Sequence, residues 1–207
     1  MPAAADSAVV LITGVMASGK STVAALLAER LPRAAHIRGD TFRRMIVSGR
    51  EEMTPSAAAD PGGEARAQLD LRHRLSAATA DEYAAHGFTA VVQDILLGPD
   101  LATWVGRIRT RPLYVVVLAP SAETVAAREN ERTKTGYGLW TVESLDSLLR
   151  DHTPRIGLWL DTSTHTPEQT LATLLANLPA AEVRDHRPAA EHPDQQVDHP
   201  DGTTVAG

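Results

Sequence analysis

Residues 8–31 read AVVLITGVMASGKSTVAALLAERL, and this stretch decides the fold of the chain. Within it, residues 14–21 match the phosphate-loop pattern G-x-x-x-x-G-K-[ST] in full. The preceding run, 8–13, is short and β-branched with no polar face, which is typical of a strand buried on both sides. The following run, 21–31, has the apolar spacing of a helix and ends at Pro32. Because strand, loop and helix follow in the required order, we favour a nucleoside triphosphate site over a chance match.

The residue types in the loop explain how it would hold phosphate. Gly14 and Gly19 let the backbone wrap a phosphate chain, with N–H groups pointing inward at the positive end of the next helix. Lys20 reaches the β- and γ-phosphates, and the Ser21 hydroxyl is suited to ligate Mg²⁺. We therefore predict an ATP site formed by Gly14, Ala17, Ser18, Gly19, Lys20, Ser21 and Thr22.

The composition narrows the class of protein. The 207 residues, 43% of them hydrophobic, are enough for one sizeable core. The absence of cysteine excludes disulfides and thiolate metal sites, and no signal or membrane segment is evident, so we expect a cytoplasmic protein. The net charge of −6 without a basic block argues against nucleic acid as a partner.

Apolar runs alternate with helix-like segments along the chain. This alternation predicts an α/β doubly wound domain with a parallel sheet covered on both faces. The further strands are expected at 34–37, 88–92, 113–118 and 156–160, and the helices at 41–47, 64–85, shortly after Pro99, and at 121–131, 142–150 and 167–177.

Two segments depart from the alternation. Residues 48–63 are rich in Gly, Pro, Ala and Ser, which suits a mobile loop over a substrate pocket, with a plain connector as the alternative. From about residue 180 the chain is dominated by Pro, His, Asp, Glu and Gln, and we expect disorder. The predicted organisation is a phosphate-loop domain over 1–179 and a disordered acidic tail over 180–207.

Asp40 follows the second predicted strand and should face the same crevice as the phosphate loop, because ligands of such sheets bind beyond the carboxyl ends of the strands. This position suits a general base that takes the proton of an acceptor hydroxyl. The alternative is a helix N-cap. Of the two arginines that follow, we favour Arg43 over Arg44 as the one facing the crevice, since the Asp-x-x-Arg spacing places it beside Asp40.

Asp94 follows the third predicted strand. An aspartate at the tip of a buried strand near a phosphate loop is typical of a residue that holds Mg²⁺ directly or through water, with a substrate contact or loop cap as the alternative. Arg128 and Arg132 share a helix face before a glycine-flanked segment, which favours a lid that brings guanidinium groups over the γ-phosphate. A solvated face of arginine and glutamate is the alternative.

These motifs together resemble the small phosphate-loop kinases of the chloramphenicol phosphotransferase-like group. The likeness rests on the phosphate loop, Asp40, the HGF entry to VVQD at residues 86–94 and the R-x-x-x-R lid, and it spans residues 8–178. It implies a five-stranded parallel sheet of order 2-3-1-4-5 and ATP-dependent phosphorylation of a small-molecule hydroxyl, with Asp40 at the position of the family's base. The Asp40-x-x-Arg43 pattern is also similar to polynucleotide 5′-hydroxyl kinases.

The sequence therefore predicts an ATP- and Mg²⁺-dependent small-molecule kinase in which Ser21 and Asp94 hold the metal. Asp40 would act as the base, and Lys20, Arg43, Arg128 and Arg132 would balance charge. A polynucleotide 5′-hydroxyl kinase and a nucleotide-responsive binding module that transfers no phosphate are the alternatives. The acceptor, the nucleobase preference and the oligomeric state stay open.

Overall fold

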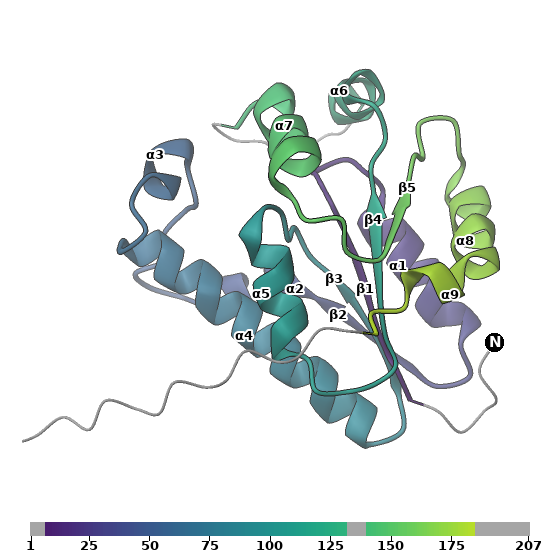
Figure 1. Cartoon of the computed structure of the whole chain (residues 1–207). Helices are drawn as coiled ribbons and strands as arrows, with labels where there is room; N and C mark the ends of the chain where they lie inside the picture. The colour runs from purple at the N-terminus through teal and green to yellow at the C-terminus, as the bar shows by residue number, and fades with distance from the viewer. Residues whose placement is uncertain (1–6, 132–139, 185–207) are drawn as a thin grey trace, which may run out of the picture.

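The apolar run before the phosphate loop forms β1 (Val9–Gly14), in which every residue is buried. In the computed structural model, which describes residues 7–131 and 140–184, β1 lies at the centre of a five-stranded parallel sheet (Figure 1). The order β2-β3-β1-β4-β5 confirms the predicted fold. The other strands are β2 (Ala34–Arg38), β3 (Thr89–Gln93), β4 (Leu113–Leu118) and β5 (Leu158–Leu160).

Every predicted helix is present, and the long one at 64–85 has the predicted ends. In the part of the chain that the structure describes, two short helices, α3 (Pro55–Ala58) and α9 (Leu178–Ala181), were not predicted. The helices are α1 (Lys20–Arg30), α2 (Gly39–Arg44), α3 (Pro55–Ala58), α4 (Glu64–Ala85), α5 (Pro99–Arg107), α6 (Ala122–Asn130), α7 (Val142–His152), α8 (Pro167–Ala176) and α9 (Leu178–Ala181).

Helices cover both faces of the sheet and bury a separate apolar core on each (Figure 1). On one face, α4, α5 and α7 pack on the sheet around Trp104, whose side chain is fully buried and whose Nε1 donates to Ser76 Oγ at 2.9 Å. On the other face, α1 and α8 pack through residues such as Leu27 and Leu174. The carboxyl ends of the strands are therefore held on a scaffold that is packed from both sides.

The ordered domain extends beyond the predicted boundary at residue 179. Ala181 and Val183 are buried, and the Val183 amide donates to the Leu113 carbonyl at 2.9 Å. Glu182 forms a bridge to Tyr114 of β4. The prediction of disorder from residue 180 is therefore wrong for 180–184, because the apolar side chains of Ala181 and Val183 pack against the core. The rest of the predicted tail, 185–207, lies outside the described residues.

The segment 48–63 is not entirely without secondary structure, since it contains α3, whose first turn is capped by Thr54. No helix among the described residues combines the length and apolar character that crossing a membrane requires.

Candidate active site

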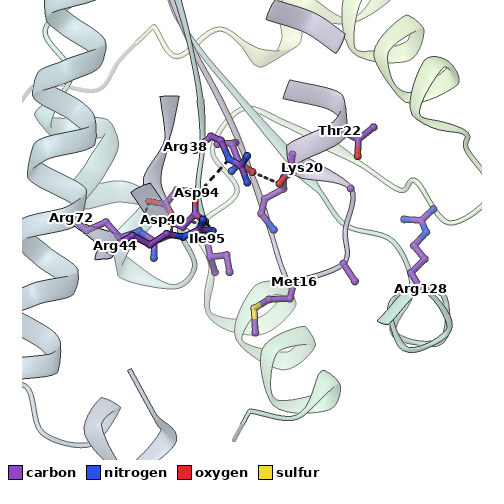
Figure 2. A pocket seen from close by; sticks show the side chains of 14 residues that line it. Met16, Lys20, Thr22, Arg38, Asp40, Arg44, Arg72, Asp94, Ile95 and Arg128 are labelled. Carbon is purple, nitrogen blue, oxygen red and sulfur yellow. Dashed lines mark hydrogen bonds and ion pairs between the residues drawn. The ribbon is translucent and has the colours of Figure 1, made fainter. Parts of the chain in front are cut away.

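A cleft of about 440 Å³ opens at the carboxyl ends of β1, β2 and β3 (Figure 2). Parallel pairing places Gln93 at the end of β3 opposite Ile12 of β1 and Arg38 of β2, so that the three strands end together. The charged side chains that line the cleft are mostly cationic, which favours an anionic ligand. These charged residues are Lys20, Arg38, Asp40, Arg44, Arg72, Asp94 and Arg128.

The phosphate loop has a backbone conformation that depends on its residue types. Gly14 has a φ of 143°, and a Cβ there would lie 2.4 Å from the Leu118 carbonyl oxygen, so only glycine fits. Ala17 adopts a φ of 58°, which is uncommon for a residue with a side chain. The loop is thus held in its turn by the neighbouring strand before any ligand binds.

Lys20 and Ser21 begin α1 directly after this loop. The Lys20 side chain is largely buried, and its Nζ donates to the Val15 carbonyl at 2.5 Å across the loop. The Ser21 hydroxyl donates to Gln93 Oε1 at 2.8 Å. A hydroxyl that donates its hydrogen to Gln93 keeps its lone pairs for a cation, so Ser21 fits the role of a Mg²⁺ ligand.

Gln93 was not predicted as a site residue. Its side chain reaches Ser21, whereas that of Asp94, the next residue, points toward α4. The available signal was the alternation of side chains along a strand, because Gln93 is the last residue of β3 and Asp94 follows it directly.

Asp94 is fully buried and is bound by Arg72 of α4. Arg72 donates from Nε to Asp94 Oδ2 at 3.0 Å and from Nη2 to Oδ1, and the Ile95 amide also donates to Oδ1 at 2.7 Å. Gly39 packs so closely that a Cβ on it would lie 1.9 Å from Asp94 Oδ2. Because Arg72 donates to both carboxylate oxygens, this geometry favours the water-mediated form of the predicted metal role.

Asp40 lies in the first turn of α2, and its side chain is 31% exposed. Oδ2 pairs with Arg44, four residues later, whereas Oδ1 lies 3.8 Å from Arg38 Nε and has no hydrogen-bond partner among the described residues. The helix-cap alternative is wrong, because Arg38, and not Asp40, is the N-cap residue of α2.

Arg44, and not Arg43, shares the cleft with Asp40. Arg43 forms an ion pair with Glu52 in the loop after α2 and does not line the cleft. The predicted preference for Arg43 is therefore wrong. The spacing of three residues would allow Arg43 to lie beside Asp40. The ion pair with Glu52, which lies outside the Asp-x-x-Arg pattern, holds the Arg43 side chain elsewhere.

Arg128 approaches the phosphate loop from the side opposite Arg44 and Arg72 (Figure 2). Its Nη2 donates to the Thr162 carbonyl at 2.8 Å. It also lines a second cavity of about 240 Å³ beside the loop, where Thr162 Oγ1 and His165 Nδ1 are buried with no hydrogen-bond partner in the described part of the chain. Arg132, the second predicted lid arginine, lies outside the described residues.

Among residues 7–131 and 140–184, no group of three or more His, Asp or Glu side chains is placed to hold a metal. A divalent cation at this site would thus depend on the phosphates of a bound nucleotide, as is usual for Mg²⁺.

Comparisons with known proteins agree with this architecture. A sequence model of a family described as an AAA domain matches residues 9–155. No curated protein matches the chain.

Several solved structures share the fold. An unliganded sugar kinase from Janibacter sp. HTCC2649 is 22% identical with a TM-score of 0.60, covering 85% of this chain and 96% of its own. The APS kinase CysC of Mycobacterium tuberculosis, in complex with AMPPNP and APS, is 20% identical with a TM-score of 0.61, covering 84% and 99%. A gluconokinase from Sinorhizobium meliloti 1021 is 21% identical with a TM-score of 0.55, covering 84% and 91%.

Proposed function

The chain belongs to this AAA domain family, and from that premise we propose that it is an ATP- and Mg²⁺-dependent kinase that transfers the γ-phosphoryl group to a hydroxyl of a small molecule. The observation that carries the proposal is the position of Asp40, which lines the same cleft as Lys20 of the phosphate loop and whose Oδ1 accepts no hydrogen bond from any residue that the structure describes. We place the chain near the chloramphenicol phosphotransferase-like kinases. The absence of cysteine supports a cytoplasmic location.

In the proposed reaction, the phosphate loop binds the nucleotide. The loop amides and Lys20 bind the phosphates, with Lys20 exchanging the Val15 carbonyl for a phosphate oxygen. Ser21, oriented by Gln93, would hold Mg²⁺, with Asp94 contributing through water. The metal would supply positive charge that neutralises the phosphate oxygens.

The nucleoside is proposed to occupy the second cavity, beside Arg128. Thr162 Oγ1 and His165 Nδ1 are available there for hydrogen bonds to a base or ribose. Arg128 lines both cavities, so it is placed to contact the phosphates from the side opposite Arg44.

In the proposed reaction, Asp40 is the general base that acts on the acceptor hydroxyl. A hydroxyl that displaces the Arg38 side chain would donate to Oδ1, and the carboxylate would take its proton as the oxygen attacks the γ-phosphorus. The bond from the γ-phosphorus to the β–γ bridging oxygen would break in the same transfer, and ADP would leave. Arg44 holds the other carboxylate oxygen and so fixes the direction of Oδ1. Catalysis would come mainly from positioning and electrostatic stabilisation.

The test is a transfer assay with ATP labelled on the γ-phosphate, Mg²⁺, a library of small hydroxyl compounds and oligonucleotides with 5′-hydroxyl ends. We expect label on a small molecule, and much less of it when Lys20→Ala replaces the wild type. Label on oligonucleotide ends would instead support a polynucleotide kinase. Tight ATP binding without transfer to any acceptor would support the binding module.

A further inference from the structure

The acceptor side of the cleft, defined here as Arg38, Asp40, Arg44 and the Arg72–Asp94 pair, carries more cationic than anionic groups. Figure 2 shows Asp40, Arg44, Arg72 and Asp94 gathered on one side of Lys20, with Arg128 on the other. Three arginines thus face two aspartates in a space that, in the proposed function, receives the acceptor and not the nucleotide.

The charge of one of these arginines is neutralised by its partner. Arg72 and Asp94 are 14% and 0% exposed, and two guanidinium nitrogens donate to the carboxylate. This pair is neutral and directed inward, so it adds little attraction for a ligand.

The other two arginines share a single carboxylate. Arg38 and Arg44 both lie against Asp40, and their side chains are 50% and 66% exposed. A guanidinium group has five N–H donors, and each of these two spends only part of that capacity on Asp40. The group of three therefore has one surplus positive charge and several donors that reach the cleft.

Resting on the kinase function proposed above, we propose that the acceptor carries an oxyanion, a carboxylate or a phosphate or sulfate group, close to its reacting hydroxyl, and that Arg38 and Arg44 bind it. The planar guanidinium group matches two oxygens of such an anion. The anion also gives both arginines a second partner, which leaves Asp40 Oδ1 available to the hydroxyl. A neutral acceptor would leave the surplus charge uncompensated.

The test measures anion binding to the protein saturated with Mg²⁺ and AMPPNP, so that the phosphate loop is filled. The probes are two matched pairs, sulfate against dimethyl sulfone and acetate against acetamide, titrated by NMR at constant ionic strength. The test variant carries both Arg38→Gln and Arg44→Gln. The control variant is Arg74→Gln, which removes one positive charge from the surface of α4. The Arg74 side chain is 60% exposed and pairs with Asp70.

We expect the wild type and Arg74→Gln to bind an anion and not its neutral counterpart, and the double variant to bind it at least ~10-fold more weakly. Preference for sulfate would indicate a phosphate-like group, and preference for acetate a carboxylate. Equal anion binding by the wild type and the double variant, or no anion binding by either, would overturn the inference while leaving the kinase proposal intact. Failure of AMPPNP to bind would overturn both.

Discussion

The two sides of the cleft are built in different ways. On the phosphate-loop side, residues 14–22, the geometry is set by backbone conformation and by a lysine that is only 8% exposed. On the acceptor side, the geometry is set by side-chain ion pairs, and Arg38 and Arg44 are at least half exposed. The first side tolerates little change without loss of the loop. On the second side, the exposed Arg38 and Arg44 can change while the fold is kept, which is where differences in acceptor between related kinases would arise, whereas the buried Arg72–Asp94 pair supports the fold.

The largest expected effect comes from breaking the one buried ion pair on the acceptor side. Arg72→Met leaves Asp94 buried and without its cation, so we expect the free energy of unfolding to fall by about 3–5 kcal/mol. Denaturant titration measures this, with Arg74→Met as the exposed control at under about 1 kcal/mol. A small loss in Arg72→Met would mean that Asp94 does not depend on Arg72 and is open to direct metal coordination.

The next effect tests the phosphate-loop side. Lys20→Ala removes the charge that would follow the γ-phosphate, so we expect phosphoryl transfer to fall by about 10²- to 10³-fold or more. Far-UV circular dichroism should show an unchanged fold, because Lys20 adds charge to the loop and little to the apolar cores. Unchanged transfer by the folded variant would remove the kinase interpretation.

A smaller effect separates two adjacent arginines of α2. Arg44→Gln should lower kcat/KM for the acceptor by about 10-fold, because Arg44 holds Asp40 in the cleft. Arg43→Gln should stay within about twofold, since it loses only an exposed ion pair with Glu52. A larger loss in Arg43→Gln than in Arg44→Gln would restore the assignment that the sequence spacing suggested.

The smallest effect concerns the helix that carries Arg72. Burial lowers the pKa of His73 and outweighs the opposing charges of Asp94 and Asp100. Folded His73 thus stays neutral at a pH at which the unfolded side chain, with an ordinary pKa of 6.5, takes up a proton. The stability that this difference provides is therefore lost as the pH falls below about 6.5, at no more than about 1.4 kcal/mol per pH unit.

This prediction is checked by chemical denaturation between pH 7.5 and pH 5. The fall in stability on acidification should be shallower in His73→Gln than in the wild type, and unchanged in His152→Gln, whose side chain is exposed on α7. An equal slope in all three proteins would assign the acid sensitivity to other groups.

Much of the scaffold could be predicted because its signals are local. α4 and β4 were predicted with their observed ends, since one is a long helical segment ended by Gly87 with a φ of 79° and the other an uninterrupted apolar run. β5 is shorter than predicted, because Gly157 takes a φ of 70° just before it. The packing of Ala181 and Val183 was missed because isolated apolar residues at the start of a mostly polar stretch give no periodic pattern.

In the candidate site too, some residues could be predicted from local sequence and others could not. Gly14, Lys20 and Ser21 could be named from spacing alone, because the loop motif itself specifies their roles. The partners of Asp40 and Asp94 could not, because Arg44 was set apart from Arg43 by Glu52, and Arg72 reaches Asp94 from a distant helix. Contacts of that kind depend on how separate elements pack, which no local pattern records.

The central claim is that Asp40 makes this a phosphate-transferring enzyme and not only a nucleotide-binding protein. The most direct measurement compares AMPPNP affinity and phosphoryl transfer in folded Asp40→Asn. Asparagine keeps the shape of the side chain but accepts no proton, so we predict nucleotide affinity within a few-fold of the wild type and transfer reduced by ~10² to 10⁴. Near-normal transfer by Asp40→Asn would contradict the account.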